Sequence, residues 1–273
     1  CILGSYAAVA QEPISPEQVS PEQASPEQQA DRSAAVPATA ATPAIEEPAI
    51  SLKQLAGNVI HDQKPIFTFP WRAAHGAHWT PVVGVVLGTA ALVILDPYTE
   101  SYFHNPTRFN GYKTGPLRGR NSTLAITMTP VAFFVTGLAK HSTHARNTGL
   151  LAAEAVADTQ ILSFVMKQAI GRSKPSDIPP DGSLRDTWFK YKGSFSNGGS
   201  FPSGHTASAF AVATVVASRY KEHRWLPYVA YGAATFLSLT RLPDRAHFAS
   251  DIFFGAAMGY GISHFIVLGR HTN

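Results

Sequence analysis

The stretch Phe201-Pro202-Ser203-Gly204-His205 opens an apolar segment that runs to residue 218. Serine and glycine behind a proline are typical of a turn that begins a helix, so we expect a helix to run on from His205. The exposed backbone amides of a helix start can bind an anion, and glycine lets the oxygens of that anion approach closely. This short stretch therefore predicts an anion site at the beginning of a helix.

Three further stretches place charged and polar side chains at fixed spacings: Lys167-x6-Lys174-Pro175, Thr240-Arg241 and His247-x3-Asp251. Their cations can neutralise the charge on phosphate oxygens, and an arginine can bind two oxygens at once. His247 and Asp251 are one helical turn apart, so we expect the carboxylate to accept the Nδ1 proton and leave Nε2 free to attack phosphorus. His205 then remains to protonate the leaving oxygen.

The apolar pattern suggests how these stretches meet. Six apolar segments are expected to be helices: 82–95, 124–139, 148–167, 205–218, 226–240 and 252–268. Lys167 ends the third, His205 begins the fourth, Arg241 follows the fifth and Asp251 precedes the sixth. In an up-and-down bundle all four of these ends lie at one pole. The sequence therefore predicts that polar residues up to 84 positions apart converge.

Taken together, the four stretches resemble the signature of the type 2 phosphatidic acid phosphatase / vanadium haloperoxidase superfamily. That signature reads Lys-x6-Arg-Pro, Pro-Ser-Gly-His and Ser-Arg-x5-His-x3-Asp. The resemblance covers residues 80–268 and implies an all-α fold, a six-helix up-and-down bundle. It implies a set of phosphate-binding residues: Lys167, Lys174, Ser203, Gly204 and Arg241. By the same resemblance, His205 is the acid and His247 is the nucleophile held by Asp251.

The chain departs from that signature at two positions. Thr240 stands where serine is usual, which keeps the hydroxyl. Lys174 stands where arginine is usual, which exchanges a planar, two-pronged donor for a point charge. Arg172, two residues earlier, is an alternative phosphate ligand that would compensate for this exchange. The second departure bears on affinity and rate rather than on the class of reaction.

The resemblance implies a phosphatase that hydrolyses a phosphomonoester through a phosphohistidine, without a metal or other cofactor. Its substrate would be a lipid phosphate, a polyprenyl diphosphate or a soluble monoester, and vanadate would act as an inhibitor. One alternative is a vanadate-dependent haloperoxidase, with vanadate as a cofactor on His247. Another is a non-catalytic envelope protein that binds phosphate or lipid, suggested by Lys174. Halide oxidation would identify the first alternative, and ligand binding without turnover the second.

The sequence leaves membrane insertion open. The apolar runs of the first, second, fifth and sixth segments hold 14, 16, 15 and 17 residues, whereas a span usually needs about 20. The residues before the first segment nevertheless resemble a membrane interface, with Phe67, Phe69, Trp71 and Trp79 around Arg72. Both an integral membrane protein and a soluble periplasmic protein of a bacterial envelope fit this pattern, and membrane association is expected in either form.

The N-terminal fifty residues differ in kind from the rest. Residues 1–10 are small and apolar, which indicates the remnant of an export signal, although Cys1 also fits a lipidated mature N-terminus. Residues 11–50 repeat Ser-Pro-Glu-Gln and are rich in alanine, so a disordered tether is expected. They carry seven acidic residues and one arginine, whereas residues 51–273 carry 21 Lys/Arg and 11 Asp/Glu. We expect residues 51–273 to form the phosphatase domain, with the motifs in 160–255, and no nucleic-acid partner.

Overall fold

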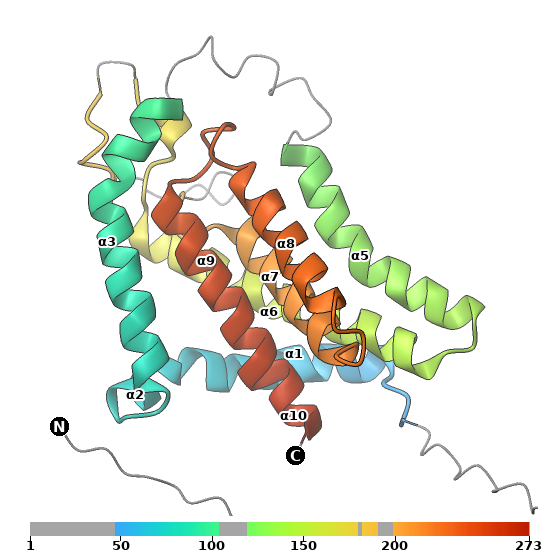
Figure 1. Ribbon diagram of the computed structural model, residues 1–273. Coiled ribbons are helices and arrows are strands. Elements are labelled where there is room, and N and C mark those ends of the chain that lie inside the picture. Colours follow the sequence, from blue (N-terminus) through green and yellow to red (C-terminus); the bar gives the residue numbers. More distant parts are fainter. Residues whose placement is uncertain (1–46, 104–118, 180–181, 191–198, 273) are drawn as a thin grey trace, which may run out of the picture. The chain divides into compact units, whose positions relative to one another are not determined.

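The computed structural model describes residues 47–103, 119–179, 182–190 and 199–272 (Figure 1). Within these ranges every regular element is helical: α1 (Leu52–Phe67), α2 (Phe69–Ala74), α3 (Trp79–Phe103), α5 (Gly119–Ala139), α6 (Thr143–Ile170), the 3-10 turn η1 (Pro175–Asp177), α7 (Gly204–Arg219), α8 (Leu226–Leu239), α9 (Ala249–Gly261), the π-helix η2 (Ile262–Val267) and α10 (Leu268–Thr272). The all-α prediction is confirmed. The predicted segments correspond to α3, α5, α6, α7, α8 and α9 with η2. The predicted signal remnant 1–10 and most of the tether 11–50 lie outside the described residues.

Helix α7 is the central helix and contacts α6, α8 and α9 (Figure 1). Its inward positions are small, and Ala207, Ala211 and Val215 have no exposed surface. Small side chains let neighbouring helices approach each other closely. At Gly259 on α9, an added Cβ would overlap the main-chain oxygen of Ala207. At Gly255 it would press on the main-chain oxygen of Ser203. This close packing places the start of α9 beside the start of α7.

The helix ends that carry the polar motifs meet at one pole of the bundle, as predicted. Helix α6 ends there, α7 begins there, α8 ends there and α9 begins there. Main-chain hydrogen bonds join the connecting segments: the Ser203 amide donates to the Asp251 carbonyl (3.1 Å), and the Ser200 amide donates to the Arg172 carbonyl (2.7 Å). The pole is therefore a single hydrogen-bonded unit rather than a set of independent loops.

Four helical stretches of the described chain are long and apolar enough to cross a membrane: Trp79–Phe103, Gly119–Ala139, Thr143–Asp177 and Ala249–Arg270. Two of them are much longer than the apolar runs suggested, with 25 residues in α3 and 21 in α5. The apolar runs underestimated both lengths, because each helix continues into polar residues beyond its apolar part. Helix α3 continues through Asp96 and Pro97 to Phe103, and α5 begins with Gly119 and Arg120.

Helices α1 and α2 are additional to the predicted segments, and only α2 and the last residue of α1 lie in the expected aromatic flank. Helix α1 begins with a capping box, in which the Ser51 side chain accepts from the Gln54 amide and the Gln54 side chain accepts from the Ser51 amide. Its polar side faces the bundle: Asn58 donates to Glu154 (3.0 Å) and Gln63 donates to Asp158 (2.8 Å). This contact gives the polar residues of α6 partners.

Three carboxylates gather where α1, α6 and α10 meet, at the end of the bundle opposite to the motifs. Asp62, Glu154 and Asp158 are buried there, and Arg270 of α10 donates to Glu154 (3.0 Å) and pairs with Asp62. Because Arg270 already lies among these carboxylates, we interpret the cluster as an ion-pair network that attaches the chain's last helix. Buried charges of this kind persist when they are paired.

The packed unit begins a few residues earlier than the predicted boundary at residue 51. Glu47 pairs with Arg219 at the end of α7 (2.5 Å), and the Ile50 amide donates to Asn147 on α6 (2.9 Å). Residues 47–50 are thus attached to the helical bundle, and they belong to it rather than to the tether.

Candidate active site

Two lysines reach the pole from the end of α6 and the segment behind it. Lys167 lies in the last turn of α6, which ends at Gly171 in the left-handed conformation (φ 56°). Lys174 directly precedes η1 and is half-buried. Lys167 is close enough to Lys174 and Arg241 for the three charges to act on one another. The structure therefore brings the three predicted phosphate-binding cations into one region.

The beginning of α7 has the helix start on which the predicted anion site depends. Ser203 is the N-cap, and its hydroxyl accepts a hydrogen bond from the Thr206 amide (3.4 Å) and lies 2.9 Å from the Thr206 hydroxyl. The amides of Gly204 and His205 follow in the first turn, where a helix has no carbonyl partners for its N–H groups. Gln160 of α6 donates to the Gly204 carbonyl (2.9 Å) and fixes this turn from behind.

Arg241 follows α8 and is almost fully buried. Its Nη1 lies 3.1 Å from a carboxylate oxygen of Asp244, three residues further on. The start of α5 lies against it, since a Cβ added to Gly119 would overlap the guanidinium. Thr240, the threonine in place of the family's serine, donates its hydroxyl to the Leu237 carbonyl (2.5 Å). The preserved hydroxyl therefore has a structural partner within its own helix.

The predicted histidine–carboxylate pair differs from the expectation in one respect. His247 precedes α9 and Asp251 lies in its first turn, so the two do not share a helical turn. The Nδ1 atom of His247 lies 3.7 Å from Asp251 Oδ2 but only 2.8 Å from the Ser200 carbonyl oxygen. A carbonyl can only accept, so Nδ1 carries the proton and Nε2 holds the lone pair. The expected nucleophilic atom is retained, but its orientation comes mainly from Ser200.

Asp251 is fully buried and holds the turn in which His247 lies. It accepts hydrogen bonds from the Phe248 amide (2.8 Å), from the Ser200 hydroxyl and from Arg172 (2.5 Å). Ser200 thus contacts both members of the pair, through its carbonyl and through its hydroxyl. Asp251 acts on the position of His247 chiefly through this neighbour.

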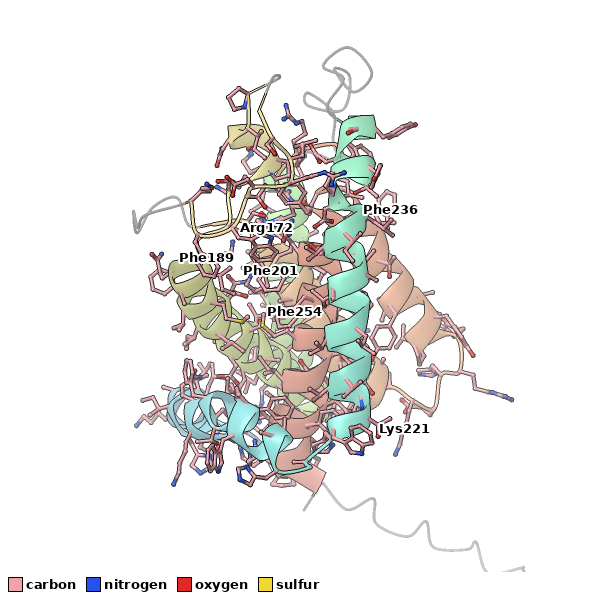
Figure 2. The ribbon with its side chains drawn as sticks, turned by 90° about the vertical axis from the view of Figure 1, so that its left-hand side faces the viewer. Arg172, Phe189, Phe201, Lys221, Phe236 and Phe254 are labelled. Carbon is pink, nitrogen blue, oxygen red and sulfur yellow. The ribbon has the colours of Figure 1, made fainter. Side chains whose placement is uncertain are left out.

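The structure does not favour Arg172 as the alternative phosphate ligand that the sequence suggested. Its guanidinium donates to four buried side chains: Thr187 (3.2 Å), Ser250 (2.7 Å), Asp251 (2.5 Å) and Asp96 (2.7 Å). The guanidinium carbon also lies 4.3 Å from the ring centroid of Trp188 and 4.0 Å from that of Phe248. Arg172 lies in the interior beside Phe201 (Figure 2). Because buried side chains already accept from all three guanidinium nitrogens, we interpret Arg172 as a residue that stabilises the pole.

His205 points toward α5, where its Nε2 lies 2.5 Å from the hydroxyl oxygen of Thr123. Thr123 also donates to the Gly119 carbonyl (2.8 Å), so the start of α5 fixes the hydroxyl. Nothing in the sequence indicated this contact, because Thr123 precedes an apolar segment and belongs to none of the four stretches.

The electrostatic environment of the two histidines is positive. Burial, and then the charges of Arg241, His247 and Lys167, lower the pKa of His205 to about 3. Burial also lowers the pKa of His247 below its usual value; Lys167 and Arg241 act in the same direction, whereas Asp251 opposes them. Both imidazoles are therefore neutral near pH 7 without a bound anion. A phosphate dianion among these cations would raise both pKa values.

Part of the chain is similar in sequence to known proteins. Residues 148–273 match the PAP2 superfamily. The chain is 43% identical over 61 residues to the Lipid A 1-phosphatase of Porphyromonas gingivalis, which covers 22% of this chain and 14% of that protein. It is 32% identical over 99 residues to the Lipid A 1-phosphatase of Rhizobium etli, which covers 36% of this chain and 40% of that protein. The chain thus spans well under half the length of these relatives.

Among solved structures, the chain is similar to the first transmembrane PAP2 type phosphatidylglycerolphosphate phosphatase from Bacillus subtilis. The two are 20% identical, with a TM-score of 0.44, over 70% of this chain and 95% of that one.

Proposed function

We propose that this chain, whose residues 148–273 match the PAP2 superfamily, is a phosphatase that removes the phosphate of a membrane lipid. The observation that carries the proposal is the convergence of three cations and two histidines at the start of α7. Four helices long and apolar enough to cross a membrane favour a lipid over a soluble substrate. The relatives favour testing the 1-phosphate of lipid A first.

The proposed reaction has two steps. In the first, Nε2 of His247 attacks phosphorus while the ester P–O bond breaks. His205, which is protonated once the bound phosphate dianion raises its pKa, gives a proton to the leaving oxygen. In the second, water attacks the phosphohistidine, the P–N bond breaks, and His205 takes the proton from that water. Lys167, Lys174 and Arg241, together with the α7 amides, neutralise the charge on the equatorial phosphate oxygens.

The test is release of inorganic phosphate by the purified chain in detergent from four substrates. These are lipid A 1-phosphate, phosphatidic acid, a polyprenyl diphosphate and a soluble monoester. Hydrolysis of a lipid with little hydrolysis of the soluble monoester supports the proposal. Binding without turnover would instead identify a phosphate- or lipid-binding protein, and halide oxidation after loading with vanadate would identify a haloperoxidase.

We expect the hydrolysis to continue in EDTA, because the cations of the pole supply the charge that a metal ion would otherwise supply. Vanadate should inhibit competitively, since it can mimic the five-coordinate phosphoryl group. Both are measured as initial rates at several substrate concentrations. Loss of activity in EDTA that returns with a divalent ion would refute the metal-independent mechanism.

The pH dependence of kcat/KM follows from the pKa of His247. The attacking imidazole must be neutral, and burial lowers its pKa below 6.5. It therefore stays neutral, and able to attack, at pH values where an ordinary histidine is protonated. We expect the acidic limb of the kcat/KM profile to have its midpoint below 6.5. A midpoint above that value would contradict the assignment of this buried histidine as the nucleophile.

A further inference from the structure

Helix α3 is apolar and leaves most of its side chains exposed or partly exposed, but it buries two acids at the end near the active pole. Asp96 and Glu100 are the buried residues of this helix. Each pairs with an arginine from a connecting segment of the pole, Asp96 with Arg172 (2.7 Å) and Glu100 with Arg245 (3.1 Å). These two ion pairs attach the apolar helix α3 to the pole.

Asp96 is one end of a chain of direct hydrogen bonds that reaches His247. It accepts from Arg172 and also from the Ser250 amide (3.1 Å) and hydroxyl (2.5 Å). Arg172 in turn donates to Asp251 (2.5 Å). The side chains that lead from Asp96 to His247 are at most 1% exposed, and His247 itself is 4% exposed.

The last link runs through Ser200. Its hydroxyl donates to Asp251, and its carbonyl accepts from Nδ1 of His247 (2.8 Å). The Ser200 amide donates back to the Arg172 carbonyl (2.7 Å). The position of the His247 ring therefore depends on Asp251 and Ser200, and theirs depends on Arg172.

From this network we infer that Asp96 is a positioning residue of the active site: by holding Arg172 it keeps Asp251 and Ser200 where they orient His247 for attack. The inference rests on the proposed phosphatase function. It also places a necessary part of the site outside residues 148–273, the part of the chain that matches the family.

A buried ion pair is weak support for stability alone, because removing two charges from water costs about as much as their attraction returns. The ion pair can instead matter for the rate through the position of the nucleophile, since a misplacement of about 1 Å can cost on the order of 100-fold in rate. Glu100 provides a matched control. It lies one turn further along α3, is equally buried and also pairs with an arginine, but its arginine contacts the Pro175 carbonyl rather than Asp251.

The experiment compares Asp96→Asn with Glu100→Gln in the full chain, using the lipid substrate that the wild-type protein hydrolyses. Each change replaces one buried carboxyl group by a carboxamide of nearly the same size. For Asp96→Asn we expect kcat to fall by about 10- to 100-fold with KM within about threefold, because the phosphate ligands are untouched. For Glu100→Gln we expect kcat within about threefold of wild type and a comparable fall in Tm.

Ser250→Ala provides a second variant if Asp96→Asn does not fold. It removes the hydroxyl shared by Asp96 and Arg172 and leaves both charges in place, and we expect kcat to fall by about three- to tenfold with KM unchanged. Equal losses of kcat in Asp96→Asn and Glu100→Gln, or a full kcat in both Asp96→Asn and Ser250→Ala, would overturn the inference. An inactive wild-type protein is a separate result, which would refute the proposed function and with it this role of Asp96.

Discussion

His247→Ala should leave no measurable turnover of any phosphate ester, because the substitution removes the only atom that we assign as nucleophile. Nε2 of His247 holds the lone pair, since the Nδ1–H group donates a hydrogen bond to the Ser200 carbonyl. Without that lone pair, the cations of the pole can still bind phosphate but nothing attacks it. We expect the variant to bind vanadate or phosphate while hydrolysis falls to background, measured as phosphate release.

The matched control is His141→Ala, which changes an exposed histidine between α5 and α6, at the other end of the bundle. It should retain wild-type kcat. A second measurement addresses the intermediate directly: wild-type protein quenched during turnover of a ³²P-labelled substrate should carry an acid-labile, alkali-stable phosphate, as a phosphoramidate does. An acid-stable adduct, or activity retained in His247→Ala, would contradict this role of His247.

The second large effect concerns Lys174 and Arg172, which the sequence presented as interchangeable. Lys174→Ala should lower kcat/KM by roughly 10- to 150-fold, the equivalent of one charge-assisted hydrogen bond worth about 1.5–3 kcal/mol. Lys174→Arg should retain or raise kcat/KM, because guanidinium offers two parallel donors to the phosphate. Neither change should alter Tm greatly, since Lys174 is only half-buried.

Arg172→Ala should behave differently, because it leaves Asp96 and Asp251 as uncompensated buried charges. Removing one partner of a buried ion pair costs about 3–5 kcal/mol, so we expect a large fall in Tm together with loss of activity. The comparison is made on kcat/KM and on thermal unfolding in detergent. If Arg172→Ala kept its Tm and lost only substrate affinity, Arg172 would be a phosphate ligand after all.

The sequence predicted the helical segments and the pole at which they meet, because both follow from local pattern. Apolar segments define helices, and their alternation in direction sends the ends that carry Lys167, His205, Arg241 and Asp251 to the same side. The motif spacings then identified the chemistry of that pole. These conclusions needed no knowledge of which side chains touch.

The sequence analysis underestimated the lengths of α3 and α5 and did not predict α1. Asp96 and Pro97 looked like the end of an apolar run, yet α3 continues past them because each is accommodated: Asp96 pairs with Arg172, and the helix tolerates the proline. Helix α1 has its polar side turned inward, toward Glu154 and Asp158. The pattern of polar and apolar residues shows which side of α1 is polar. It does not show that this side faces the bundle, because that depends on the carboxylates of α6 that it contacts.

What the sequence alone determined about this protein is the list of reactive groups and the end of the bundle at which they gather. Only the tertiary structure decided how they are held. His247 is oriented mainly by Ser200 rather than by Asp251, Arg172 supports the site through Asp96 and Asp251, and Asp96 belongs to it. The physical reason is that these contacts join residues 47 to 79 positions apart. Such contacts depend on how helices pack, and no local spacing records that.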